Sequence, residues 1–307
     1  MSDKVLILTD GKAGHENQSK AFARALGFDY DLLEVHFKNR IAKAFSYLLD
    51  RFGVRSLKLF DRKDELQKKA AAGYRAVLGT GSGTFYAAKA FARAAKVPCG
   101  VVLFPRGYDL GSFDCILAPT FDRPPRRANV IELPANLVAA DAAFYEKGTA
   151  AFRERTSVLP EISVIIGGPN KCSKMTCEWM KTQLDRVFAE PGLKAVTTSR
   201  RTPKDVEDLI ASYPWDYALI YSKDHFNPIP AFVSLSKKLF VSAESTGMLS
   251  EACTFGSAEV VALDNLNPGK SKFRRFIESL TAEGYLNGTR KIDLSEQFAH
   301  ARSLLNI

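Results

Sequence analysis

The stretch "KVLILTDGKAGHENQSKAFARAL", residues 4–26, decides the fold, because an apolar run leads into a polar segment with two glycines and then into a helical pattern. The run before Thr9 has the length of a buried strand, whereas the residues after Asn17 carry apolar side chains at helical spacing. A second such arrangement, "ISVIIGGPNKCSK", starts at residue 162. Strand, glycine loop and helix at the start of each half predict an α/β protein with two Rossmann-like domains.

Short apolar runs alternate with helical patterns along the whole chain, as in βαβ units with parallel sheets. Strands are expected at residues 4–8, 30–35, 76–79, 100–104, 115–118 and 130–132, and in the second half from residue 162 and at 195–198, 217–221, 238–241 and 259–263. The turn-rich segment "TSVLPEI" follows a long helical pattern, so we expect domains at 1–156 and 157–307, the second ending in a C-terminal helix. The two domains are expected to face each other across a cleft, with ligands at the carboxyl ends of the strands.

Composition narrows the class of partner. The chain of 307 residues carries 43 Lys plus Arg against 34 Asp plus Glu, a net charge of +9, which favours an anionic partner. Zinc-finger spacing, RNP-type strands and a basic arm are missing, so we expect no nucleic acid. No signal-peptide core or apolar run of about 20 residues occurs, so a cytoplasmic protein is expected. The five cysteines form no CxxC, and we expect no metal site.

The first glycine segment carries candidate chemistry. Gly11 and Gly14 let the backbone approach a ligand, and the imidazole of His15 can accept a proton near neutral pH, with Glu16 able to orient or assist it. The alternative is an ordinary polar turn in which Asn17 or Ser19 caps the helix and His15 makes a structural hydrogen bond. The segment by itself leaves both interpretations open.

Three loops in the second half suit an anion. "GGPNKCS", residues 167–173, offers backbone amides, a helix start and Lys171. "TTSRRTPKD", residues 197–205, places Arg200 and Arg201 before a helix for which Thr202 is the expected cap. Each alone could be an ordinary turn or a solvated helix start.

The third loop is "VSAESTGMLSEACTFG", residues 241–256. Ser245, Thr246 and the amides of Gly247 and Met248 can point at a diphosphate, while Glu251 could accept hydrogen bonds from a ribose diol. A buried helix with one exposed glutamate is the alternative. Three such loops in one domain favour a ligand.

Two further stretches have two interpretations each. "KNRIAKAFSYLLDRF", residues 38–52, is an amphipathic basic helix that either docks its apolar face on the core or lies on an anionic membrane, helped by basic residues up to position 69. "GTGSGTF", residues 79–85, is either a tight helix start or a ligand contact.

As a set, "GKAGHENQS", "IIGGPNK", "TTSRRTP" and "SAESTGMLSEA" resemble a family of glycosyltransferase-like proteins named after the plant elongated-mitochondria (mitochondrial fission) protein and the bacterial GtrOC proteins. The resemblance covers nearly the whole chain. It implies the GT-B fold, with a nucleotide-sugar donor on the C-terminal domain and the acceptor on the N-terminal one. The first loop also looks like the glycine-histidine loop of the GT-B transferase that adds N-acetylglucosamine to the lipid-linked peptidoglycan precursor.

Carried over residue by residue, the resemblance assigns residues to an N-terminal motif and to a donor side. The N-terminal motif includes His15, which is our candidate catalytic base, and Glu16, which is the second choice. The acceptor side would use Gly11, Gly14, Asn17 and Gln18. The donor side would use Gly167, Gly168, Asn170, Lys171, Ser199, Arg200, Arg201, Thr202, Pro203, Ser245, Met248, Ser250 and Glu251. Thr246 and Gly247 join this donor side from the analysis of the third loop itself. The chain departs from the family in having Glu244 where aspartate is common and Ile229 where an NPY motif has tyrosine.

These observations lead to the hypothesis of a metal-independent glycosyltransferase without a cofactor. Its partners would be a nucleotide sugar, a glycan or lipid-linked acceptor and, through residues 38–69, an anionic membrane surface, which would place it peripherally on the inner membrane face. A nucleotide-sugar epimerase of the same fold and a non-catalytic membrane adaptor are the alternatives.

Overall fold

The computed structural model describes residues 3–307, which form two compact units. Unit 1 contains the residues up to Ala139 together with Leu294–Ile307, and unit 2 is Ala140–Asp293. The division predicted at residue 156 is therefore misplaced, and the C-terminal helix belongs to unit 1. Helix α5, Ala142–Arg155, packs on α8, Ile229–Leu235, with the Phe152 and Phe232 rings 5.9 Å apart. An amphipathic pattern shows that a helix has an apolar face but not which core will receive it.

Unit 1 is built on six parallel strands in the order β2-β1-β3-β4-β5-β6. The strands are β1 Lys4–Thr9, β2 Asp29–Glu34, β3 Val77–Thr80, β4 Cys99–Val102, β5 Cys115–Pro119 and β6 Val130–Leu133. The chain runs from β1 to β2 on one side and then to β3 on the other. The order therefore reverses between β1 and β3, where open α/β sheets bind ligands at the strand ends.

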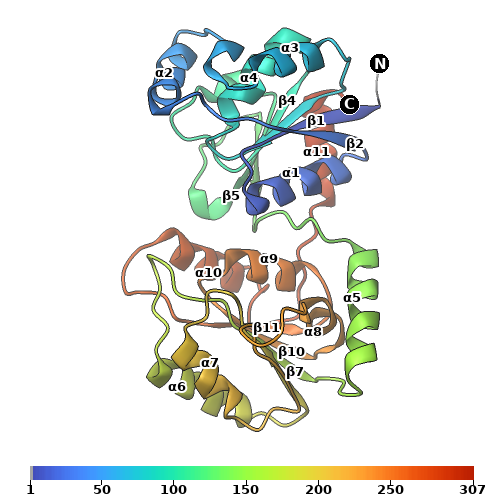
Figure 1. The fold of residues 1–307 in the computed structure, drawn as a ribbon, viewed down its shortest axis with the longest axis vertical. Helices are drawn as coiled ribbons and strands as arrows, with labels where there is room; N and C mark the ends of the chain where they lie inside the picture. Colours follow the sequence, from blue (N-terminus) through green and yellow to red (C-terminus); the bar gives the residue numbers. More distant parts are fainter. Residues whose placement is uncertain (1–2) are drawn as a thin grey trace. The chain divides into compact units, whose positions relative to one another are not determined.

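Helices cover both faces of this sheet. On one face α1, Ala13–Ala25, lies beside α11, Ser295–Leu305, which Figure 1 draws in red, and Ala301 and Leu305 of α11 are buried in the same core as Phe22. On the other face lie α3, Lys63–Ala70, and α4, Phe85–Ala95, with α2, Arg40–Arg51, beside them. Short 3₁₀ turns occur at Leu57–Leu59, Leu110–Ser112 and Thr120–Asp122.

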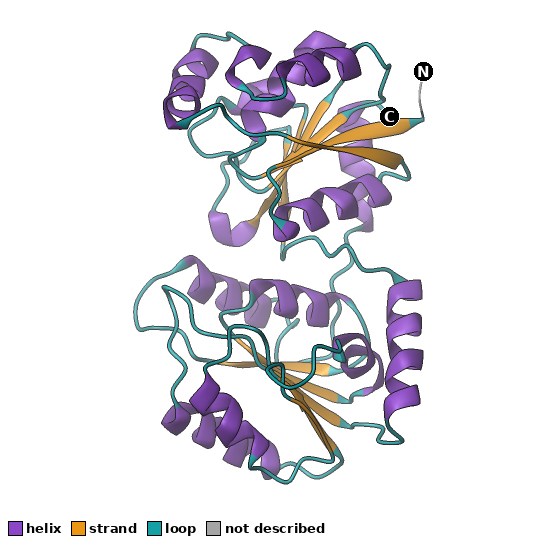
Figure 2. Cartoon of the chain, in the orientation of Figure 1, coloured by secondary structure: helices purple, strands orange, loops and turns teal. Residues whose placement is uncertain are grey.

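Unit 2 has five parallel strands in the order β11-β10-β7-β8-β9. Figure 2 draws the strands of both sheets in orange and the helices around them in purple. They are β7 Ile162–Ile165, β8 Lys194–Thr197, β9 Tyr217–Leu219, β10 Lys238–Ser242 and β11 Glu259–Leu263. One face carries α6 Cys177–Phe188 and α7 Lys204–Ala211, and the remaining helices are α5, α8, α9 Thr246–Thr254 and α10 Lys272–Ala282. Here the strand order reverses between β7 and β10.

The strands agree with the sequence pattern. Each described strand falls on a predicted one, with ends that differ by at most two residues. Within residues 3–307, no helix combines the length and apolar character needed to cross a bilayer.

One buried charge network holds α2 on unit 1. The Asp50 carboxylate accepts hydrogen bonds from Lys89 Nζ at 2.8 Å and from the Asp109 amide at 2.6 Å, and Arg55 lies 3.2 Å away. The side chains of Asp50 and Lys89 are each 1% exposed. Burial lowers the pKa of Lys89, and its hydrogen bond to Asp50 opposes that shift. The pair therefore depends on both partners being present.

We expect Asp50→Ala to destabilise unit 1 by about 3–5 kcal/mol, because Lys89 is left as a buried charge without its carboxylate. Denaturant unfolding followed by far-UV circular dichroism will measure the loss. Both tryptophans, Trp179 and Trp215, lie in unit 2, so tryptophan fluorescence should keep its midpoint. The control is Glu65→Ala, which removes the exposed ion pair between Glu65 on α3 and Arg62. It should change the free energy of unfolding by about 0.5 kcal/mol or less. An equally small effect of Asp50→Ala would contradict the prediction.

Candidate functional site

The first glycine segment is mostly helix. Gly11 turns the chain at a φ of +76°, and α1 starts at Ala13 with Lys12 as its N-cap residue and no side-chain cap. A Cβ at Gly11 would lie 2.5 Å from the Glu34 carboxylate, so the turn needs glycine. The helix thus begins four residues before the predicted position. His15, Glu16, Asn17 and Gln18 all lie on α1, and the alternative that Asn17 or Ser19 caps the helix is wrong.

Asp10 positions His15. Asp10 Oδ1 lies 2.9 Å from His15 Nδ1, and the two side chains are 7% and 24% exposed. Burial would raise the pKa of Asp10, but hydrogen bonds from Lys12 and His15 outweigh it and hold the pKa below its usual range. A carboxylate at Nδ1 favours the tautomer with its proton there, which leaves Nε2 as a proton acceptor. This is the arrangement of a general base with an orienting carboxylate.

Asp10 was not among the predicted site residues. Glu16, which was, forms an ion pair with Lys20 at 2.6 Å, one helical turn along α1. The available signal was an aspartate directly after the first strand, five residues before the only histidine of that segment.

The glycine loop after β3 makes room for this pair. Gly81 has a φ of +84°, and a Cβ there would lie 2.4 Å from the His15 ring. A Cβ at Gly83 would lie 2.8 Å from the Cβ of Asp10. Ser19 on α1 and Thr80 at the end of β3 also share a buried hydrogen bond of 2.6 Å. The loop that the sequence left undecided therefore packs against His15 and Asp10, where the strand order reverses.

The acceptor-side candidates differ in their surroundings. A Cβ at Gly14 would meet no atom within 4 Å, so this glycine leaves the surface of α1 open beside His15. Asn17 is exposed. The Oε1 atom of Gln18 is buried and has no hydrogen-bond partner within residues 3–307. Whether these residues contact an acceptor stays a prediction.

In unit 2, a buried carboxylate ties the strand-end loops together. Glu244 Oε1 accepts a hydrogen bond from the Gly168 amide at 2.7 Å, and Oε2 accepts one from Asn265 Nδ2 at 2.7 Å. Ser242 Oγ donates to Oε1 at 3.1 Å and accepts from the Gly167 amide at 2.8 Å. A Cβ at Gly167 would lie 2.1 Å from Oε1. Glu244 is 3% exposed, so it supports the loops from beneath and does not face a ligand.

The loop after β8 is tied to the same glycines. The hydroxyls of Ser199 and Thr202 donate to the Gly167 carbonyl at 2.7 and 2.6 Å, and Arg201 donates to the Gly168 carbonyl at 3.0 Å. Thr202 is not the cap of α7, since that helix starts at Lys204 after Pro203 without a side-chain cap. Gly167, Gly168, Ser199 and Thr202 thus form the framework of the loops.

Two cations remain available for an anion. Lys171 and Arg200 are exposed, and neither forms an ion pair or side-chain hydrogen bond with any other residue in 3–307. The predicted helix start next to Lys171 is wrong, because α6 begins only at Cys177 with Thr176 as cap. Asn170 Oδ1 accepts from the Cys172 amide at 2.7 Å and shapes the intervening turn.

The third anion-suited segment is a helix N-terminus, as predicted. Ser245 is the N-cap residue of α9, so Thr246, Gly247 and Met248 fall in its first turn, where N–H groups have no acceptor within the helix. Glu251, one turn further, accepts a hydrogen bond from the Tyr145 hydroxyl at 2.9 Å. Burial raises the pKa of Glu251, although this hydrogen bond opposes the shift. Tyr145, which stands 106 positions before Glu251, was not among the predicted site residues.

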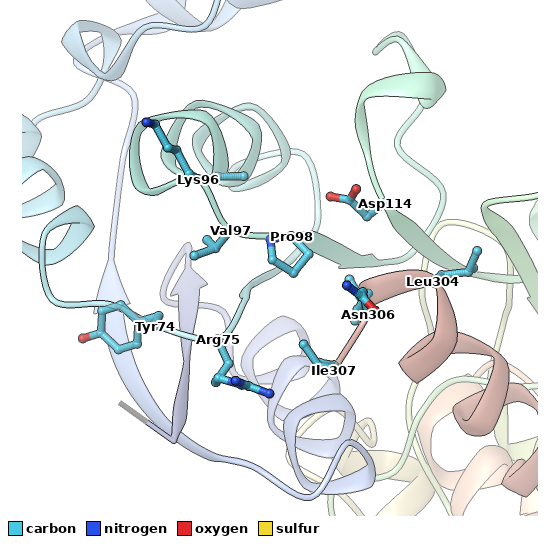
Figure 3. Close-up of a pocket in the computed structure, with 11 residues that line it drawn as sticks. Tyr74, Arg75, Lys96, Val97, Pro98, Asp114, Leu304, Asn306 and Ile307 are labelled. Carbon is cyan, nitrogen blue, oxygen red and sulfur yellow. The ribbon is translucent and has the colours of Figure 1, made fainter. Parts of the chain in front are cut away.

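A cavity of about 450 Å³ lies elsewhere in unit 1 (Figure 3). Arg75, Pro98 and Asp114, which precede β3, β4 and β5, line it together with Asn306 and Ile307. It therefore lies at the amino ends of the strands, and no predicted site residue contributes to it. The candidate residues of unit 1 lie at the opposite, carboxyl ends of these strands.

Comparison with solved structures places this fold among known ones. UDP-GlcNAc 2-epimerase from Methanocaldococcus jannaschii is similar with a TM-score of 0.57 and 14% identity, over 98% of this chain and 98% of that chain. UDP-GlcNAc 2-epimerase from Neisseria meningitidis bound to UDP-GlcNAc gives 0.53 and 15%, over 99% and 98%. Arabidopsis thaliana UGT89C1 complexed with UDP gives 0.54 and 10%, over 99% and 90%. At these identities the likeness concerns the fold alone, and it confirms the predicted GT-B type with two Rossmann-like domains.

Comparison with protein sequences identifies the family. Mitochondrial fission protein ELM1 of Arabidopsis thaliana is 25% identical over 257 residues, which cover 73% of this chain and 59% of that protein. The chain thus spans less than two thirds of the length of this relative. The family described as Mitochondrial fission ELM1 matches residues 13–302. Because this match includes nearly the whole sequence, the chain belongs to the Mitochondrial fission ELM1 family.

Proposed function

We propose that the protein transfers a sugar from a nucleotide-activated donor to an acceptor hydroxyl. The observation that carries this proposal is the Asp10–His15 pair at the point where the strand order of unit 1 reverses. Similar folds bind UDP-GlcNAc and UDP in their solved structures, which supports a nucleotide sugar as the donor.

In the proposed reaction, His15 Nε2 accepts the proton of the acceptor hydroxyl while its oxygen attacks the anomeric carbon of the sugar. The bond between that carbon and the phosphate oxygen breaks, and the nucleotide leaves with the bonding electron pair. Asp10 stabilises the imidazolium that forms. No redox partner is needed, since one C–O bond replaces another.

Unit 2 would bind the donor and stabilise the leaving group. Lys171 and Arg200 supply unpaired positive charge, and the N-terminus of α9 supplies amide dipoles at Gly247 and Met248. Fixed cations of this kind can replace a metal ion, so metal independence is part of the proposal. The loop framework beneath them would keep these groups in place before the donor arrives.

We expect His15→Ala to reduce transfer by about 10²–10⁴-fold, because it removes the general base. Asp10→Asn should cause a loss of similar order, since the amide no longer favours the required tautomer. Donor affinity should stay near wild type in both variants. Sugar transfer and nucleotide binding, measured in parallel, separate the two effects.

Glu16→Gln decides between the two catalytic candidates of α1. Glu16 contacts Lys20 and not His15, so most of the activity should survive this change. A large loss with Glu16→Gln and a small one with His15→Ala would transfer the role of base to Glu16.

Lys171→Ala and Arg200→Ala should each weaken binding of a nucleoside diphosphate by about tenfold, because each removes a charge-assisted contact. Neither residue supports the loops, so the melting temperature without ligand should not change. Arg201→Ala should lower both affinity and melting temperature, since Arg201 also donates to the Gly168 carbonyl. Thermal shift with nucleotides and nucleotide sugars measures both quantities. Unchanged affinity in the first two variants would contradict this assignment of the donor side.

An epimerase is the second candidate, favoured by the likeness to two UDP-GlcNAc 2-epimerases. Product analysis distinguishes the two reactions. A donor sugar that epimerises without any acceptor would support the epimerase, whereas sugar attached to an acceptor, with release of the nucleotide, would support transfer.

A further inference from the structure

Helix α2 exposes its apolar side. Ile41 is 79% exposed, Phe45 47%, Leu48 49% and Phe52, just after the helix, 73%. These positions follow each other at spacings of four, three and four residues, so they form one stripe along the helix. Val54, in the turn that follows, adds a side chain that is 43% exposed.

The opposite side of α2 packs on unit 1 through polar groups together with Tyr47 and Leu49. Ser46 and Asp50 are its buried residues, and Ser46 Oγ lies 2.9 Å from the Tyr108 hydroxyl. The Tyr47 ring stacks on Tyr108 with centroids 4.4 Å apart. The network of Asp50 and Lys89 holds the same side. Leu49 packs against the core of unit 1, whereas Ile41, Phe45, Leu48 and Phe52 remain exposed, so docking of the whole apolar face on the protein's own core is wrong.

Positive charge flanks the apolar stripe. Exposed basic side chains stand at Lys38, Arg40, Arg51 and Lys58, and none of them forms an ion pair within the described part of the chain. Between residues 35 and 60 the only acidic residue is Asp50, which is buried and paired. An apolar stripe with a cationic border matches the surface of an anionic bilayer. A second copy of the chain fits poorly, because a symmetric contact would bring two cationic borders together.

The stripe is connected to the candidate base. Lys43, on α2, donates a hydrogen bond from Nζ to Ser82 Oγ at 3.0 Å. Ser82 lies between Gly81 and Gly83, which pack against His15 and Asp10. The surface that would meet a membrane and the proposed base thus belong to neighbouring segments of one unit.

We infer that α2, with residues 52–54, docks on an anionic phospholipid surface and that the acceptor is a lipid-borne hydroxyl compound reached from that surface. The second part rests on the proposed transfer reaction. The apolar stripe enters the interface between headgroups and acyl chains, and the basic residues bind lipid phosphates. His15 then acts on an acceptor held at the membrane.

Co-sedimentation of the full chain with phosphatidylcholine vesicles, with and without phosphatidylglycerol, tests the docking. We expect strong binding only to the anionic vesicles. Ile41→Ser with Phe52→Ser, and separately Arg40→Glu with Arg51→Glu, should each lower the partition coefficient about tenfold or more. Leu159→Ser in unit 2, which changes a side chain that is 51% exposed, is the matched control and should bind as wild type. Circular dichroism and melting temperature verify that each variant is folded, and the charge variants keep the test valid if the serine variants are not.

Wild-type binding by both double variants, or equal binding to neutral and anionic vesicles, would overturn the inference. The inference would also be overturned if the wild-type protein bound no vesicles but formed a dimer in analytical ultracentrifugation, and the serine variants were monomers. The proposed function is tested separately by nucleotide-sugar binding and by transfer to a soluble acceptor. If these occur without vesicle binding, the membrane inference fails alone; if vesicles bind but nucleotide sugars do not, the docking surface stands and the transfer reaction fails.

Discussion

All strands of a parallel sheet have their carboxyl ends on the same side of the sheet. In each unit the strand order reverses once along that side. The loops on either side of the reversal must diverge to opposite faces, so they leave space that backbone alone cannot fill. In unit 1 this space holds Asp10 and His15, which fit there because Gly81 and Gly83 have no side chains. In unit 2 the Glu244 carboxylate occupies it and fixes the loops after β7 and β10. The same constraint gives a candidate catalytic pair in one unit and a rigid loop framework in the other.

Burial separates the residues that support from those that could react. Glu244 is covered by the loops it holds, whereas Lys171 and Arg200 project from the same loops without partners among the described residues. Removing a buried carboxylate that accepts hydrogen bonds from backbone amides costs stability, because those amides are left without a partner. While it is present, the carboxylate keeps the exposed cations at fixed positions. The glycines at 167 and 168 serve this packing, since a side chain at either position would collide with Glu244 or Arg201.

Much of the fold could be predicted from the sequence, because strand runs such as Ile162–Ile165 and the glycines after them are local signals. The contacts that build the site are harder to predict, because they depend on where a helix starts or join residues far apart in sequence. Asp10 meets His15 only because α1 begins at Ala13, and Glu244 meets Gly168 across 76 positions of sequence. The sequence could not show which side of α2 is buried, because Asp50 pairs with Lys89, which lies 39 positions further along the chain. Periodicity reveals that a helix has two sides, but only tertiary partners determine which side is buried.

The return of α11 to unit 1 has a consequence for how the chain acquires its structure during synthesis. The sheet and first helices of unit 1 are made early, but Ala301 and Leu305 complete the core around Phe22 only after the whole of unit 2 has been translated. Unit 2 is continuous in sequence and can fold while unit 1 still lacks that part of its core. During this interval the apolar face that α11 later covers is uncovered, which makes unit 1 the part of the nascent protein most dependent on protection from aggregation.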